Sequence, residues 1–84
     1  MTNTELAMLA VYGSAVPLEK ICLPYFGLSY PEARRLAATN DLPVPTFRAR
    51  ASAKAPLLIH TAVFAKYIDE TAEQQEMEWN RSQV

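Results

Sequence analysis

The sequence predicts a small α+β domain in which two short helices are followed by a β-hairpin and a longer helix. Three observations support this class. Two segments with helical spacing of apolar residues are separated only by "FGLS", residues 26–29. Two β-leaning runs, "LPVPTFRAR" and "PLLIH", flank a loop of small and basic residues, and the polar last quarter of the chain keeps a helical pattern. We expect one domain over residues 1–84, with an acidic C-terminal helical extension over residues 69–84.

The length of 84 residues allows only a thin hydrophobic core. Half of the residues are apolar and 20% are charged, which indicates a folded chain. The single cysteine, Cys22, cannot form an internal disulfide, and together with the single histidine, His60, it does not make a zinc site. The chain has no apolar run long enough to span a membrane, and we expect no secretory leader, because the first residues lack the basic start and the longer apolar core of one. We therefore expect a cytoplasmic protein without a metal or a cofactor.

The first segment, residues 3–12, fits either a helix or a strand. Thr2 and Glu5 have capping-box spacing, which favours a helix. The short apolar run that follows is equally compatible with a strand. Gly13 and Ser14 then interrupt the segment in either case.

The first helix of the pair is predicted over residues 17–26. Pro17 suits the first helical position, and Pro24 should distort the last turn before Gly27 ends the helix. The apolar face follows positions i, i+3, i+4, i+7 and i+8, occupied by Leu18, Ile21, Cys22, Tyr25 and Phe26. Cys22 is therefore expected in the core.

The second helix is predicted over residues 30–39. Ser29 and Glu32 again have capping-box spacing. The small and apolar side chains of this segment fall on one face, so Arg34 and Arg35 point away from the core.

Residues 43–60 are predicted to form a β-hairpin with "RASAKA" at its tip. Pro43 and Pro45 exclude a helix and confine any strand to the edge of a sheet. A final helix follows from Thr61, the predicted N-cap. Beyond Ile68 the helix is mostly polar, so its end should project from the core or meet a partner.

This order of elements is that of a winged helix-turn-helix domain. Net charge is −2 over residues 1–33, +5 over residues 34–66 and −4 over residues 67–84. A basic island on the second helix and the wing indicates double-stranded DNA as the partner. The predicted DNA-binding residues are Tyr30, Arg34, Arg35, Arg48, Arg50, Ser52 and Lys54. Arg34 or Arg35 would read base edges and the wing would hold phosphates, although Ser52 fits a turn-forming role equally well.

The chain also resembles the pyocin activator protein family of small bacterial and prophage-encoded transcriptional activators. The resemblance covers about three-quarters of the chain and rests on ordered motifs, among them Pro17-Leu18, Tyr25-Phe26-Gly27, Glu32 to Arg35, Leu42-Pro43-Val44-Pro45, Phe47-Arg48, Lys54-Ala55-Pro56 and Tyr67-Ile68-Asp69. The chain departs from the family pattern at Ala53, where a Gln is common, and at Leu57, where an aromatic residue is common. The resemblance implies promoter binding and activation of phage-derived or bacteriocin genes.

No nucleophile, phosphate-loop or metal motif indicates an enzyme. The competing functions are a sequence-specific activator, an excisionase-like architectural DNA-binding protein and a protein-binding module. Few contacts per copy favour a homodimer or a cooperative array on DNA, with the tail around Trp79 as the expected contact between copies. Three interpretations of the acidic tail stay open. It can be a solvated helix face, it can limit non-specific DNA binding, or it can contact RNA polymerase.

Overall fold

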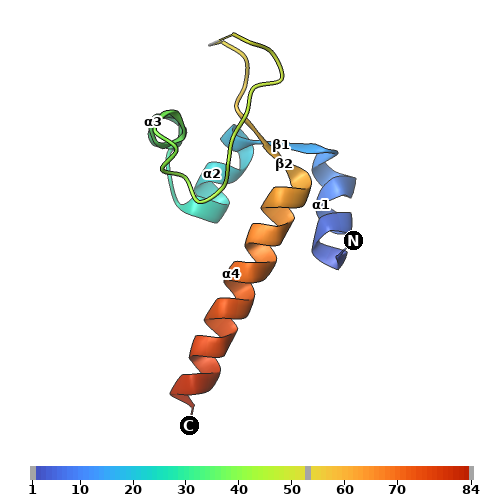
Figure 1. Ribbon diagram of the computed structural model, residues 1–84, viewed down its shortest axis with the longest axis vertical. Helices are drawn as coiled ribbons and strands as arrows, with labels where there is room; N and C mark the ends of the chain where they lie inside the picture. The colour runs from blue at the N-terminus through green and yellow to red at the C-terminus, as the bar shows by residue number, and fades with distance from the viewer. Residues whose placement is uncertain (1, 53, 84) are drawn as a thin grey trace.

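A computed structural model describes residues 2–52 and 54–83 and has an α+β architecture. In the described residues, four helices accompany one two-stranded antiparallel sheet (Figure 1). In chain order the elements are α1 (Asn3–Tyr12), β1 (Ala15–Pro17), α2 (Leu18–Phe26), α3 (Tyr30–Ala38), β2 (Leu58–His60) and α4 (Thr61–Ser82). The α+β prediction is confirmed.

The first segment is a helix and not a strand. Thr2 is the N-cap of α1, and its hydroxyl oxygen accepts a hydrogen bond from the backbone N–H of Glu5 at 3.1 Å. This bond satisfies one of the amides that a helix start leaves without a partner. Gly13 ends α1 at a φ of 76°, a region that favours glycine, and its N–H donates to the carbonyl of Leu9.

The sheet joins β2 to β1, a strand that the sequence did not predict. The pairs are Ala15 with His60, Val16 with Ile59 and Pro17 with Leu58. Three residues are too few to show an alternating pattern, and Pro17 was assigned to the first turn of the helix that follows it. Instead, Pro17 is the N-cap of α2 and the last residue of β1.

Residues 43–60 were predicted to form a hairpin of two strands, and this prediction is wrong: the first arm is not a regular strand. The two arms meet at one antiparallel bridge, where Phe47 and Leu58 exchange two backbone hydrogen bonds of 2.8 Å. Pro43 and Pro45 have no N–H to donate, so the outer arm cannot continue the ladder toward its N-terminal end. The return arm pairs with β1 on its other side.

Thr61 is the first residue of α4 and not its N-cap, which is His60. The Thr61 side chain is fully buried, and its hydroxyl donates to the backbone carbonyl of Gly13 at 2.6 Å. Its own N–H donates to the carbonyl of Ser14 at 3.0 Å. The two bonds fasten the start of α4 to the turn between α1 and β1, which is more than forty residues away in sequence.

We expect Thr61→Val to lower the free energy of unfolding by about 1–3 kcal/mol, because it removes a buried donor and leaves the Gly13 carbonyl without that partner. Valine keeps the shape of the side chain. The measurement is urea denaturation followed by far-UV circular dichroism. Thr71→Val is the matched control on the same helix and should change stability by less than about 0.5 kcal/mol. Equal losses in the two variants would contradict a stabilising role for the buried bond.

Phe64 of α4 lies at the centre of the core and is fully buried. The Tyr25 ring meets it edge-to-face at 5.1 Å between ring centroids, and the Phe26 ring does so at 6.2 Å. The other core residues are Met8, Val16, Leu18, Ile21, Cys22, Ala33, Ala37, Val44, Leu57, Ile59 and Ala65. The predicted buried position of Cys22 is therefore confirmed, and α2 and α3 pack against each other as a helix pair.

The second half of α4 projects from this core, as predicted. The helix has 22 residues, which corresponds to a length of about 33 Å. Residues 72–83 are all exposed. The loop between α3 and β2 lies at the opposite end of the molecule from the C-terminus (Figure 1), along a longest dimension of 51 Å. Among the described residues, no helix is long and apolar enough to cross a membrane.

Candidate nucleic-acid interface

Local sequence determines where helix α3 begins and ends. Ser29 is its N-cap, as predicted, but the Ser29 side chain makes no capping hydrogen bond. At the other end Asn40 adopts a φ of 58°, and its N–H donates to the carbonyl of Ala37. The N–H of Asp41 donates to the carbonyl of Leu36, which completes a Schellman-type ending. Asparagine tolerates this left-handed backbone better than most residues.

The two arginines of α3 lie in different surroundings. The guanidinium of Arg34 lies over the ring of Tyr30, 5.7 Å from its centroid, in a cation–π contact. Arg35 instead approaches Glu32 one turn earlier, at 3.9 Å, and its side chain is 71% exposed. An exposed ion pair of this length stabilises the helix very little. The contact nevertheless directs Arg35 along the helix and leaves Arg34 as the residue that faces the loop.

The basic loop, residues 43–57, is held by its own hydrogen bonds. The Nε of Arg48 donates to the carbonyl of Ala55 at 3.1 Å, which joins the two arms near the tip. The Ser52 hydroxyl accepts from the backbone N–H of Lys54 at 3.2 Å, so the turn-forming role of Ser52 is present in the structure. The backbone N–H of Ser52 donates to the carbonyl of Arg50, and that of Ala55 to the carbonyl of Ser52.

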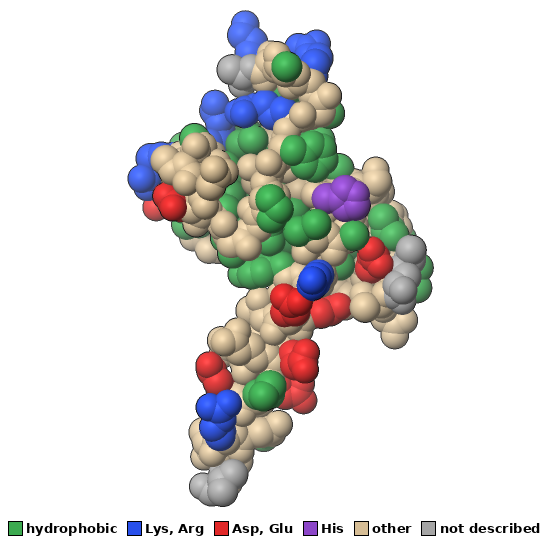
Figure 2. All heavy atoms as spheres, in the orientation of Figure 1, with side chains coloured by type: hydrophobic (Ala, Val, Ile, Leu, Met, Phe, Trp, Pro, Cys, Tyr) green, Lys and Arg blue, Asp and Glu red, His purple; other side chains and the backbone are tan. Residues whose placement is uncertain are grey.

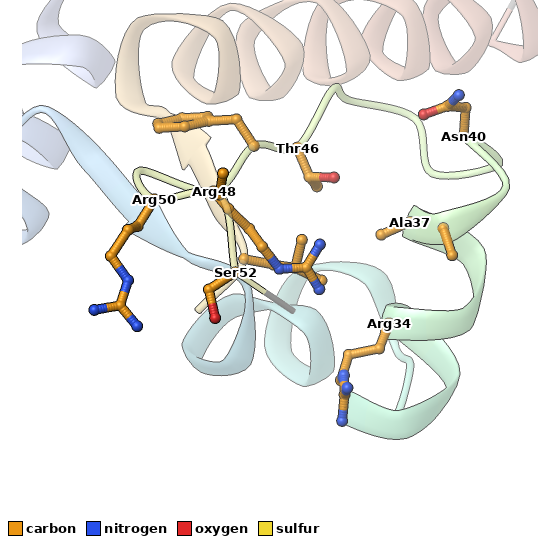
Figure 3. Close-up of a pocket in the computed structure, with 11 residues that line it drawn as sticks. Arg34, Ala37, Asn40, Thr46, Arg48, Arg50 and Ser52 are labelled. Carbon is orange, nitrogen blue, oxygen red and sulfur yellow. The ribbon is translucent and has the colours of Figure 1, made fainter. Parts of the chain in front are cut away.

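A groove separates α3 from the basic loop and collects most of the predicted site residues. Arg34 from α3 and Arg48, Arg50 and Ser52 from the loop line this groove. Figure 3 shows Arg48 extending from the loop toward α3, whereas the side chain of Arg50 extends away from α3 on the other side of the loop. Among the described residues, its wall comprises Arg34, Ala37, Ala38, Asn40, Thr46, Phe47, Arg48, Arg50, Ala51, Ser52 and Leu57.

A second hollow adjoins the first and shares Arg34 and Arg48 with it. Its wall comprises Glu19, Tyr30, Arg34, Arg48, Lys54, Ala55 and Pro56. We call the two hollows together the cationic groove. Arg35 is the one predicted site residue that lines neither hollow, because it turns toward Glu32. Glu19 brings one carboxylate to the rim, which the local sequence around the basic loop did not reveal.

The groove also contains residues that the sequence did not indicate as site residues, among them Asn40, Thr46 and Phe47. Asn40 could have been found from its position after a predicted helix, where asparagine often takes the left-handed conformation. Phe47 is 40% exposed, although an aromatic residue in a predicted strand suggests a core position. Thr46 carried no separate signal. Ala53, where the family commonly has Gln, lies outside the described residues.

Charge separates along the molecule. Figure 2 shows most of the blue side chains on the basic loop and beside it, and the red ones mainly along α4, which also carries the basic residues Lys66 and Arg81. His60 is exposed at the end of β2 and caps α4. Within residues 2–52 and 54–83, no group of three or more His, Cys, Asp or Glu side chains could hold a metal ion.

The fold and the groove define a small α+β protein that gathers its cations between one helix and one irregular loop, away from an acidic tail helix. The family described as "Pyocin activator protein PrtN" matches residues 5–75, which include most of α1, all of α2 and α3, and the basic loop. The chain therefore belongs to the pyocin activator family. No curated protein and no solved structure matches the chain.

Proposed function

We propose that the chain is a sequence-specific, double-stranded-DNA-binding transcriptional activator of pyocin or related phage-derived genes in the cytoplasm. The observation that carries this proposal is the convergence of Arg34 from α3 and Arg48 from the basic loop on one open groove. Guanidinium groups from two separate elements suit a phosphate backbone and the base edges beside it. Membership in the pyocin activator family supports the transcriptional role.

In this proposal residues 1–84 form one winged helix-turn-helix domain with an acidic extension over residues 69–84. Helix α2, the turn at Gly27 and helix α3 are the helix-turn-helix, and the basic loop is the wing. Gly27 has a φ of 68°, and its N–H donates to the carbonyl of Leu23 at 3.0 Å, which closes α2 and redirects the chain. Helix α3 would enter the major groove, where the first residues of a recognition helix reach base edges.

The proposed roles follow from where each side chain lies. Tyr30 and Arg34 stand in the first turns of α3, and Arg34 can present two parallel N–H groups to a guanine. The loop residues Arg48, Arg50, Ser52 and Lys54 would contact phosphates, which position the protein without reading sequence. The turn bond leaves the hydroxyl hydrogen of Ser52 available for donation. Arg35 would make at most a peripheral phosphate contact.

Binding of more than one copy is part of the proposal. Specific protein–DNA complexes usually have dissociation constants of about 10⁻⁸ M or lower at physiological salt. The five candidate cations, Arg34, Arg35, Arg48, Arg50 and Lys54, release at most about five counterions per copy, which is modest for a lone domain. We therefore propose a homodimer or a cooperative array on DNA, with RNA polymerase as the partner in activation and with no cofactor or enzymatic step.

We expect Arg34→Ala to weaken binding to a selected DNA site by about 1–3 kcal/mol, or about 5- to 150-fold, with little loss on random duplex DNA. The reason is that only the selected site offers the base that Arg34 reads. The site is first obtained by sequencing genomic fragments that the purified protein retains. Fluorescence anisotropy of labelled duplexes then gives the affinity of each variant for both kinds of DNA.

Arg35→Ala is the matched control for this prediction, because it removes the same charge from the next position of the same helix. It should reduce binding to both kinds of DNA by similar small factors. Equal losses on selected and random DNA for Arg34→Ala would refute the base-reading role. Transcription from the selected site with purified polymerase then separates an activator from an excisionase-like protein, which would bend its site without raising transcription.

A further inference from the structure

The exposed part of α4 carries an acidic stripe. Asp69, Glu73 and Glu76 stand at positions i, i+4 and i+7, which places them on one face of the helix. At a rise of about 1.5 Å per residue, their backbone positions are about 6 Å and about 4.5 Å apart along the axis. Trp79 follows Glu76 by three residues on the adjoining face and is 62% exposed. The stripe therefore combines regularly spaced carboxylates with an exposed indole.

Most of this stripe has no partner within the chain. Asp69 accepts a hydrogen bond from the Thr4 hydroxyl at 2.6 Å, and the neighbouring Glu70 forms an exposed ion pair with Lys66 at 3.8 Å. Among the described residues, Glu73 and Glu76 form no ion pair within 4.0 Å. Both side chains are exposed to solvent, together with those of the rest of the projecting helix. Two carboxylates and a tryptophan are thus available to another molecule.

The cationic groove of the same chain is out of reach of this stripe. The groove lies beside α3 and the basic loop, whereas the projecting half of α4 points toward the opposite end of the molecule (Figures 1 and 2). A continuous helix cannot fold back on itself without breaking several backbone hydrogen bonds. Any contact between the stripe and a groove must therefore join two copies.

We propose that the acidic stripe of one copy docks in the cationic groove of a second copy. The groove is lined by four cationic residues, Arg34, Arg48, Arg50 and Lys54, of which Arg34 and Arg48 line both hollows. Arginine pairs with carboxylates through the same two-pronged geometry that it uses for phosphates, so a row of carboxylates fits a site that suits a row of phosphates. The chain thus carries a positively charged surface, the groove, toward one end and a negatively charged surface, the stripe, toward the other.

An apolar contact accompanies the complementary charges. Phe47 lines the groove and is 40% exposed, and Leu57 lies on the same wall. Trp79, at the edge of the stripe, brings an exposed indole that can pack against Phe47 once the carboxylates are seated. Aromatic residues of this kind often anchor the centre of a protein interface. Complementary charge and apolar contact therefore both favour pairing of the acidic stripe with the cationic groove.

The contact is head-to-tail, so a pair of copies keeps one unused groove on one copy and one unused stripe on the other, and the association extends into chains or rings. Its charged groups are exposed, and salt screens it strongly. Competition between stripe and DNA for the groove rests on the proposed function, whereas the contact between copies does not. A duplex with a continuous phosphate array displaces the stripe, while brief non-specific encounters with DNA are suppressed.

The test compares the double variant Glu73→Gln/Glu76→Gln with the matched double variant Glu70→Gln/Glu78→Gln in the full chain. Both remove two negative charges from α4, but the second leaves the stripe intact. Sedimentation equilibrium at low salt should show self-association of the wild type, weakened about tenfold or more in the stripe variant and less than about threefold in the control. Equal effects of the two variants, or a wild type that stays monomeric at low salt, overturn the proposal.

A mixing experiment establishes which surfaces meet. Arg34→Gln/Arg50→Gln loses groove charge and keeps the stripe, whereas Glu73→Gln/Glu76→Gln keeps the groove. Each variant alone should stay monomeric. An equimolar mixture should form one-to-one dimers, because the unchanged groove of one variant can bind the unchanged stripe of the other. Failure of the mixture to dimerise refutes the head-to-tail contact. Binding of random DNA measured in parallel tests the proposed function separately: self-association without any DNA affinity at low salt would refute that function and leave the contact in place.

Discussion

Phe64→Ala is expected to lower the free energy of unfolding by about 3–5 kcal/mol. The ring is fully buried and touches both aromatic residues at the end of α2, Tyr25 and Phe26. Alanine would leave a cavity where α2 meets α4, and the neighbouring rings cannot all move into it. Total stabilities of small domains are about 5–15 kcal/mol, so this loss brings an 84-residue chain close to unfolding.

Urea denaturation monitored by far-UV circular dichroism measures this loss. Trp79 is a poor reporter because it lies on the projecting part of α4, far from the cavity. Val63→Ala is the matched control, since Val63 precedes Phe64 on the same helix and is 37% exposed. It should cost less than about 1 kcal/mol. A similar midpoint shift in both variants would mean that Phe64 does not hold α2 and α4 together.

The helix pair was predictable because its signals are local. In α2 the apolar residues repeat with helical spacing over nine residues, and Gly27 stands where the left-handed turn is needed. The capping bond between Thr2 and Glu5 also follows from spacing alone, once a helix is chosen over a strand. The projecting end of α4 was predictable from the loss of apolar residues beyond Ile68.

The sheet was not predictable, because its partners are far apart in sequence. Val16 pairs with Ile59, which is more than forty residues away in sequence. Strand β1 has only three residues, which is too short for a recognisable strand pattern. The two β-leaning arms suggested pairing with each other, but prolines reduced that pairing to the bridge between Phe47 and Leu58. The role of Thr61 changed for the same reason, since its hydroxyl bonds to Gly13 and not to its own helix.

The candidate site was predictable in its residue types and less so in its arrangement. Helical spacing places Arg34 and Arg35 on the outer surface, but it cannot tell which one faces the loop. That choice depends on the Glu32 contact of Arg35 and on the course of the basic loop. The same folding of the loop brings in Asn40 and Phe47, which no charge pattern marks.

The salt dependence of DNA binding is expected to report how many of these cations engage. If the four groove cations Arg34, Arg48, Arg50 and Lys54 contact phosphates, log K should fall against log salt with a slope of about −3.6 per bound copy. Raising monovalent salt from about 50 to about 200 mM then weakens binding about 150-fold. If Arg35 contributes as well, the slope approaches −4.5 and the loss about 500-fold.

The measurement uses anisotropy titrations of one duplex at several salt concentrations, at protein concentrations below the onset of self-association. Arg48→Ala should flatten the slope by about 0.9, and Arg35→Ala should leave it nearly unchanged, because Arg35 lies outside the groove. Lys66→Ala on α4 is the control, since Lys66 pairs with Glu70 on the tail helix and should not affect the slope. A slope near zero would exclude phosphate contacts by the groove, and a slope steeper than about −4.5 per copy would require cations beyond the four of the groove and Arg35. The distinction matters for the arrangement on DNA: a slope that doubles with a second bound copy indicates two grooves on the duplex, whereas an unchanged slope indicates that the second copy is held by protein contacts alone.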